Sequence, residues 1–269
     1  MEAISSSSSP PLPLPPPFGS LRLTSQRDIL KLGIVCTASF RYSEQFDWER
    51  THHEQFPQST MVWYRHSMAD FICSPRHIVL VAVDSYEPDE SSKTKAIIPA
   101  DNGWKPPEAG SEVVVGIGVW RLETLSRCIG RFQNDDAPYP TLPVYDYRDL
   151  DQGRAAKLMA VAMAAEERYI PGLPTMERIL VHSAYCNRGH GSTIARWGTA
   201  LAQADHVSQG VVATKKGAGL FSHVGYNLLT HFEVEGDEAC PEGVKFAILK
   251  YTPAPPIVPQ EEKRWCILM

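Results

Sequence analysis

The sequence RILVH at residues 178–182, followed by CNRGHGS at residues 186–192, decides the fold of this chain. The first segment is apolar, and with its flanks it predicts a buried strand over 176–183. Behind the second segment, apolar residues recur at the spacing of one helix face, which predicts a helix over 191–205. The unit is therefore a strand, a glycine-containing turn and an amphipathic helix.

The turn at 186–192 is a candidate anion site. The first four N–H groups of a helix have no internal partner, and the helix dipole favours an anion there. Gly189 and Gly191 lack Cβ atoms, so a phosphate can approach the backbone, and Arg188 can add a charge-assisted contact. Because glycines also simply make turns, this junction alone leaves a purely structural role open. A dinucleotide fingerprint would need a glycine where Ile194 stands, and no P-loop spacing is present.

The sequence around this turn resembles the GNAT superfamily of acyl-CoA N-acyltransferases, in particular its fungal-type members. The family pattern is an apolar strand, then Gln/Arg-x-x-Gly-x-Gly/Ala, then a helix, and residues 178–182 and 186–191 match it in order. Gly217 and the sequence LFSHVGY at 220–226 resemble the helix of the second family motif. Both motifs are in register within about 50 residues.

The resemblance implies an α/β (α+β) fold over residues 20–251, with a mixed, mostly antiparallel central sheet and helices on both faces. Hydrophobic periodicity along the chain agrees with this order of elements. The polar segment 84–111 is expected to be a long mobile loop. The expected helices are 26–40, 46–53, 61–73, 151–169, 191–205 and 217–224, and the expected strands are 21–23, 77–83, 112–120, 176–183, 210–214, 228–234 and 244–251.

The resemblance also implies a function, which is acetyl transfer from acetyl-CoA to the primary amine of a small molecule such as a metabolite. The amides of the motif loop would hold the coenzyme A pyrophosphate, and the strand before it would pair with the pantetheine arm beside a bulge. A backbone N–H near Val181 or His182 would polarise the thioester carbonyl. The implied coenzyme-binding residues are Leu180, Val181, His182, Asn187, Arg188, Gly189, His190, Gly191 and Ser192.

Two positions depart from the family pattern. Cys186 stands where Gln or Arg is usual, and Phe221 stands where many members have a tyrosine that protonates the leaving thiolate. The motif fixes no general base, so His182 on the strand is the catalytic candidate, with Glu177 at the start of the strand as another. Because Phe221 cannot donate a proton, a non-catalytic acyl-CoA-binding protein on a decayed GNAT fold is the alternative function.

Composition excludes several other classes. The net charge of −5 and the lack of a basic stripe argue against a nucleic-acid partner. The six cysteines never form a C-x-x-C pair, so no zinc site or other metal is expected. No secretory signal and no run of ~20 apolar residues is visible, and we expect an intracellular, cytoplasmic protein. The sequence does not indicate an oligomeric state.

Both ends of the chain have biased composition. Residues 1–19 are rich in Ser and Pro and are expected to be a disordered tail, and residues 252–269 are expected to be a flexible tail. Cys266 begins the last four residues, CILM, which fit a farnesylation motif. A chance tetrapeptide remains the alternative. Peripheral membrane association is expected only if Cys266 carries this lipid.

Overall fold

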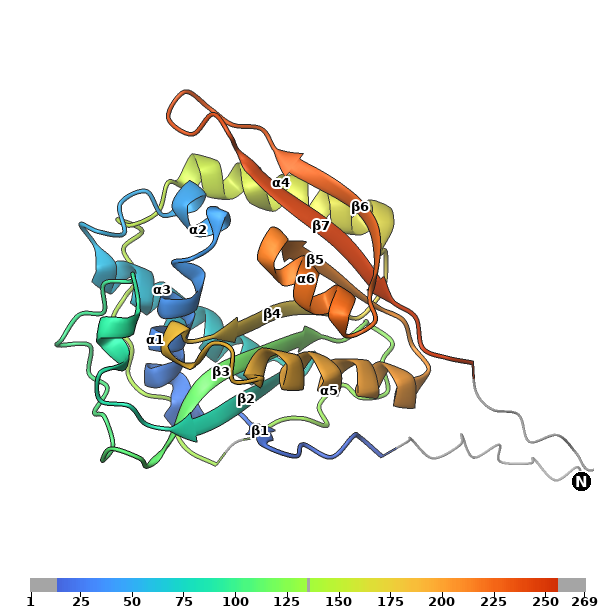
Figure 1. The fold of residues 1–269 in the computed structure, drawn as a ribbon, viewed down its shortest axis with the longest axis horizontal. Coiled ribbons are helices and arrows are strands. Elements are labelled where there is room, and N and C mark those ends of the chain that lie inside the picture. Colours follow the sequence, from blue (N-terminus) through green and yellow to red (C-terminus); the bar gives the residue numbers. More distant parts are fainter. Residues whose placement is uncertain (1–13, 135, 256–269) are drawn as a thin grey trace, which may run out of the picture.

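A seven-stranded sheet forms the centre of the computed structural model, which describes residues 14–134 and 136–255 (Figure 1). Its strand order is β1-β2-β3-β4-β5-β7-β6, and every neighbouring pair is antiparallel except β4 and β5, which are parallel. The strands are β1 (Leu21–Leu23), β2 (His77–Ser85), β3 (Glu112–Arg121), β4 (Thr175–Val181), β5 (Gln209–Thr214), β6 (Asn227–Val234) and β7 (Val244–Tyr251).

Six α-helices cover the two faces of this sheet. Helices α1 to α4 lie on one face, and α5 and α6 lie on the other (Figure 1). This arrangement confirms the predicted fold class and the predicted order of elements, with boundaries that differ by a few residues. The helices are α1 (Ile29–Phe40), α2 (Glu44–Glu49), α3 (Pro57–Cys73), α4 (Gln152–Tyr169), α5 (His190–Asp205) and α6 (Lys215–His223).

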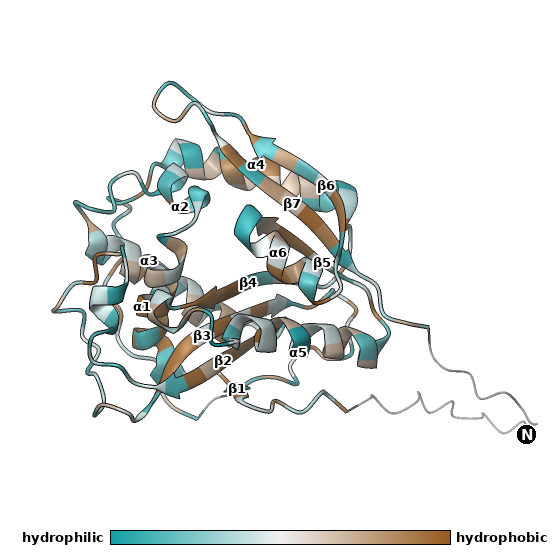
Figure 2. Cartoon of the chain, in the orientation of Figure 1, coloured by the Kyte–Doolittle hydropathy of each residue, from teal (hydrophilic) through white to brown (hydrophobic). Residues whose placement is uncertain are grey.

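Local sequence explains where several of these helices begin. Ser25 forms a capping box with Asp28 ahead of α1, and the Ser43 and Thr214 side chains accept amide N–H groups in the first turns of α2 and α6. Pro57 occupies the first turn of α3, where its missing N–H costs nothing. The strands are mostly apolar and the outer helix surfaces mostly polar (Figure 2), so helix and sheet bury their apolar sides against each other.

Trp120 on β3 sets how closely α5 approaches the sheet. A Cβ atom on Gly198 of α5 would lie 2.4 Å from the indole Nε1 of Trp120. A Cβ atom on Gly118 of β3 would lie 2.7 Å from the same ring and 2.4 Å from Ile194. The indole therefore fits between helix and strand only because both positions are glycine. This packing fixes α5, whose first turn carries the candidate anion site.

The segment between β2 and β3, expected to be a mobile loop, is anchored on α1. Lys31 of α1 forms a buried ion pair with Glu90, and its ammonium lies 4.3 Å from the ring centroid of Trp104. Tyr86 and Ala96 in the same segment are buried. Removing either partner of this ion pair would leave the other charge buried and unpaired, which would strongly destabilise the folded protein. The segment is therefore part of the folded domain.

The first described residues also pack on the domain. The indole N–H of Trp197 donates to the carbonyl of Pro16 over 3.2 Å, and the ring of Phe18 lies 5.8 Å from that of Trp197. Part of the expected N-terminal tail is thus held against α5. Residues 1–13 and Cys266 lie outside the described residues. Among the helices that the structure describes, none is long and apolar enough to cross a membrane.

Candidate active site

Strands β4 and β5 separate near the middle of the sheet. They pair only at Thr175 with Gly210 and at Met176 with Val211. On the other side of β4, the register with β3 shifts so that Val119 faces Arg178 while Trp120 faces Met176. Glu177 is therefore an extra residue in β4, and it lies where β4 separates from β5. The bulge that the sequence resemblance implied is present, and beyond it β4 leaves one edge unpaired.

The register fixes which backbone groups of β4 face this opening. The amide N–H of His182 donates to the carbonyl of Val115 over 2.8 Å. Because hydrogen-bonded and non-bonded pairs alternate in an antiparallel ladder, Leu180 also bonds to β3, whereas Ile179 and Val181 direct their N–H and C=O groups away from it. Of the three strand residues expected to pair with the pantetheine arm, Val181 alone faces the opening, and Ile179, which was not expected, shares that edge.

The motif loop presents free amide groups at the start of α5. Asn187 and Gly189 have φ angles of 65° and 90°, in the left-handed region that glycine favours. The first hydrogen bond of α5 runs from the amide of Thr193 to the carbonyl of Gly189 over 2.9 Å. The N–H groups of residues 190–192 precede this bond and have no carbonyl of their own helix to bond. Residues 187–189 are exposed, so an anion can reach the turn.

Two side chains of this loop are already engaged. The guanidinium of Arg188 pairs with Asp84 at 3.2 Å and with Glu87, and Nε2 of His190 lies 3.0 Å from Asp84. Burial would raise the pKa of Asp84, but hydrogen bonds from His190, Ser85 and Arg188 outweigh it and lower that pKa. These contacts hold the loop against the end of β2. Its backbone amides are therefore more available to bind an anion than its side chains are.

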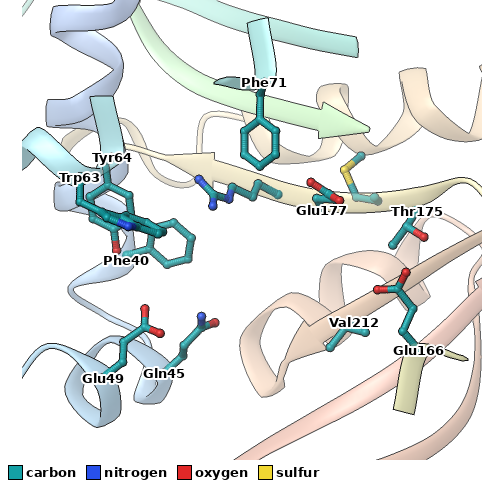
Figure 3. Close-up of a pocket in the computed structure, with 12 residues that line it drawn as sticks. Phe40, Gln45, Glu49, Trp63, Tyr64, Phe71, Glu166, Thr175, Glu177 and Val212 are labelled. Carbon is teal, nitrogen blue, oxygen red and sulfur yellow. The ribbon is translucent and has the colours of Figure 1, made fainter. Parts of the chain in front are cut away.

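A cavity of about 280 Å³ opens beside β4 on the face covered by α1 to α4. In Figure 3, Trp63, Tyr64 and Phe40 form one wall and Phe71 the roof, while Glu49 and Glu166 extend from opposite sides. The lining residues are Phe40, Gln45, Glu49, Trp63, Tyr64, Phe71, Glu166, Thr175, Met176, Glu177, Arg178 and Val212. Aromatic walls with a few charged groups are typical of a small-molecule site.

Two of the cavity carboxylates are neutralised by cations. Glu177 pairs with Arg121 at 2.7 Å and with His77 at 3.5 Å, and Glu166 also pairs with Arg121. Burial would raise the pKa of Glu177, but His77 and Arg121 together lower it. Glu177, the second candidate base from the sequence, is therefore a weak proton acceptor at neutral pH.

Glu49 is the carboxylate best suited to accept a proton. Its side chain is 12% exposed, and burial raises the pKa of its carboxyl against the opposing effects of Arg50, Gln45 and Arg178. Nothing in its sequence context marked it, because Glu49 ends a short helix far from the family motifs. Only the packing of α2 against α4 and β7 brings Glu49 to the cavity.

His182 does not suit the role of general base that the sequence suggested. Its side chain is fully buried and does not line the cavity. Burial, with a contribution from Lys31, lowers the pKa of His182 to about 3. Its Nδ1 accepts the amide N–H of Ala184 over 3.2 Å. This contact fixes the turn after β4, and burial away from the cavity keeps the imidazole from the acceptor side.

Phe221 lies inside the core between α6 and the sheet. It is 4% exposed, and its ring centroid lies 5.2 Å from that of Tyr226. The hydroxyl of Tyr226 donates to Gln209 over 2.8 Å in a buried position, so this tyrosine is occupied structurally. Neither α6 nor Tyr226, which follows it, therefore supplies a tyrosine acid, in agreement with the sequence departure at 221.

The sequence is similar to that of a known protein. No family model matches the chain. A protein named acetyltransferase from Stachybotrys chartarum is 32% identical over 236 residues, which cover 85% of this chain and 90% of that protein.

A solved structure shares the fold at low sequence identity. A Corynebacterium glutamicum protein, described as histone acetyltransferase HPA2 and related acetyltransferase, aligns with a TM-score of 0.50 and 14% identity over 89% of this chain and 98% of its own. Taken with the strand opening and the glycine loop, the relative and the shared fold show that this chain belongs to the GNAT family of N-acetyltransferases.

Proposed function

We propose that this protein transfers the acetyl group of acetyl-CoA to the primary amine of a small molecule. The observation that carries the proposal is the opening between β4 and β5, which lies between the amides of residues 187–192 on one face and the cavity on the other. The loop amides would hold the pyrophosphate, and the outward backbone groups of Ile179 and Val181 would pair with the pantetheine arm. Either of their N–H groups would polarise the thioester carbonyl.

The transfer needs a proton acceptor on the cavity side. An acceptor amine reaches the site mostly as an ammonium ion, which loses one proton to a base before its nitrogen attacks the acetyl carbonyl. The C–N bond then forms, the C–S bond breaks, and the second N–H proton goes to the leaving thiolate. Glu49 is the group that we assign as the base, because it lines the cavity and burial raises its pKa. Holding both reactants in line supplies much of the remaining rate.

Phe221 favours one alternative, which is a protein that binds acetyl-CoA without transferring the acetyl group. The proposed transfer does not require a tyrosine, since the thiolate can take the proton that the attacking amine releases. The decisive experiment incubates the full chain with acetyl-CoA and a panel of amines. Free thiol and acetylated product are both measured, and a reaction without amine is the control. Equal amounts of thiol and product are expected, whereas tight coenzyme binding with no product from any amine would favour the alternative.

A further inference from the structure

Arg178 is the charged group of the cavity that the proposed acetyl transfer does not use. It extends from β4 into the cavity lining, and within the described residues its guanidinium has no salt bridge and no hydrogen bond. Its Nη1 atom is buried without a partner. The guanidinium lies 4.7 Å from the ring centroid of Phe71 and 5.6 Å from that of Trp63. A guanidinium carries five N–H donors, and ring contacts satisfy none of them.

No carboxylate of the cavity is placed to pair with Arg178. Glu166 and Glu177 are held by Arg121. Glu49 is close enough for Arg178 to lower its pKa, but among the described residues the two form no salt bridge. The cavity therefore offers one cation without an ion pair among the described residues, Arg178, and one carboxylate, Glu49, that pairs with Arg50 at 4.0 Å. An unpaired buried charge is costly, which indicates that a ligand supplies the missing partner.

We infer that Arg178 binds the carboxylate of the acceptor, so that the acceptor is an amino acid or a related compound with both an amine and a carboxylate. This inference rests on the proposed acetyl transfer and names the acceptor class of the same site. A carboxylate can accept two parallel N–H groups from one guanidinium, which fixes the orientation of the ligand as well as its affinity. The amine of the same molecule then points toward Glu49.

The cavity walls fit such a molecule. A volume of about 280 Å³ lies at the small end of ligand sites, which suits an amino acid better than a protein segment or a long polyamine. Phe40 and Trp63 provide apolar surface for a side chain (Figure 3). We therefore expect that amino acids with an aromatic or branched apolar side chain are the best acceptors.

The test compares amino acids with their decarboxylated amines, which differ only in the carboxylate. Phenylalanine is paired with phenethylamine, and leucine with 3-methylbutylamine, using acetyl-CoA and the full chain. The wild-type protein should show a higher kcat/KM for the amino acid of each pair. Arg178→Met should lower kcat/KM for the amino acids about 10- to 100-fold, mostly through KM, because it removes a charged hydrogen-bonded contact. The same variant should leave kcat/KM for the amines nearly unchanged.

Two controls separate ligand binding from folding. Arg168→Met removes an exposed arginine whose guanidinium also contacts a ring, that of Tyr169 at 5.3 Å. This variant should change kcat/KM for neither the amino acids nor the amines. Arg178→Met should keep acetyl-CoA affinity and the thermal midpoint, since within residues 14–134 and 136–255 it removes no salt bridge and no hydrogen bond, only contacts with aromatic rings, among them those of Phe71 and Trp63. The affinity of N-acetylphenylalanine in the presence of coenzyme A, measured by calorimetry, should fall with kcat/KM for phenylalanine.

The outcomes distinguish this inference from the proposed function. If amines without a carboxylate are acetylated as well as amino acids, and Arg178→Met affects both alike, the inference is overturned while acetyl transfer stands. If no amine of either kind is acetylated although acetyl-CoA binds, both the inference and the proposed transfer are overturned. A large loss of thermal stability in Arg178→Met, with unchanged affinity for N-acetylphenylalanine, would show that Arg178 serves the fold instead.

Discussion

Nε2 of His190 lies 3.0 Å from a carboxylate oxygen of Asp84, which ties the first residue of α5 to the end of β2. Asp84 also holds Arg188, and Glu87 holds the same guanidinium. The motif loop is therefore fixed in place by side chains, while its amide groups remain open. Because the side chains are engaged and the amides are not, we expect backbone N–H groups to bind a phosphate here.

Arg188→Ala should weaken acetyl-CoA binding only slightly, by about threefold or less. The guanidinium already pairs with two carboxylates, so the phosphate gains little from an exposed charge that is screened by salt. Isothermal titration of the variant with acetyl-CoA measures this. A loss of tenfold or more would mean that Arg188 leaves Asp84 and Glu87 to bind the coenzyme.

Glu49→Gln should lower kcat by about 10²-fold or more while acetyl-CoA affinity stays unchanged, because it removes the base but not the coenzyme loop. Activity of the wild type should fall as the pH drops through the pKa of Glu49, which burial raises above its usual value. The variant should lack this acidic limb in its pH–rate profile. A profile with the same limb in both proteins would assign the base to another group.

Phe221→Tyr should leave activity unchanged or raise it, since a proton donor near the leaving thiolate can contribute about 10²-fold. The wild-type ring is buried against Tyr226, so the thermal midpoint must be measured beside the rate. A fall in activity with intact coenzyme binding would indicate that the added hydroxyl disturbs the packing of α6 at the strand opening.

The buried histidine His182 should make stability depend on pH. Burial lowers the pKa of His182 to about 3, whereas an unfolded histidine titrates near 6.5. The unfolded chain therefore binds more protons below pH ~6.5, and stability is fully present above that pH and is lost as the pH falls toward 3. Each such group contributes about 1.4 kcal/mol per pH unit in this range.

Urea unfolding at several pH values between 4 and 7 measures this slope. His182→Asn can keep an acceptor for the amide of Ala184 and should show a shallower fall in stability on acidification. Because His53 is also buried with its pKa lowered to about 4, part of the slope should remain in the variant. Identical slopes in both proteins would contradict the assigned titration of His182.

The fold and the turn before α5 could be predicted because they depend on local patterns. Period-two and helical spacing located every strand and every α-helix to within a few residues, and the two glycines fixed the loop before α5. The strand bulge was expected only through the family resemblance. The bulge at Glu177 decides which alternate residues of β4 turn their N–H and C=O groups toward β3 and which turn them toward the opening. A shift of one residue would exchange the two sets. This is why Ile179 was missed.

The acceptor side of the site could not be predicted in the same way. Glu49, Trp63 and Arg178 come from α2, α3 and β4, and no spacing in the sequence relates them. Glu177 and His182 looked like candidate bases because residue type alone was visible. Their proton affinities depend on Arg121, His77 and burial, which only the tertiary structure reveals.

The most direct test of the account is the affinity of Gly191→Glu for acetyl-CoA, measured by isothermal titration calorimetry beside the wild type and Gly153→Glu. A Cβ atom at Gly191 would meet nothing closer than Leu220 at 3.6 Å, so the variant should fold while placing a negative charge against the pyrophosphate. Gly153→Glu puts the same charge on the exposed first turn of α4 and controls for net charge. We expect Gly191→Glu to weaken binding at least tenfold, a loss above ~1.4 kcal/mol, with Gly153→Glu unchanged. Equal affinity in all three proteins would contradict the assignment of residues 187–192 as the coenzyme site.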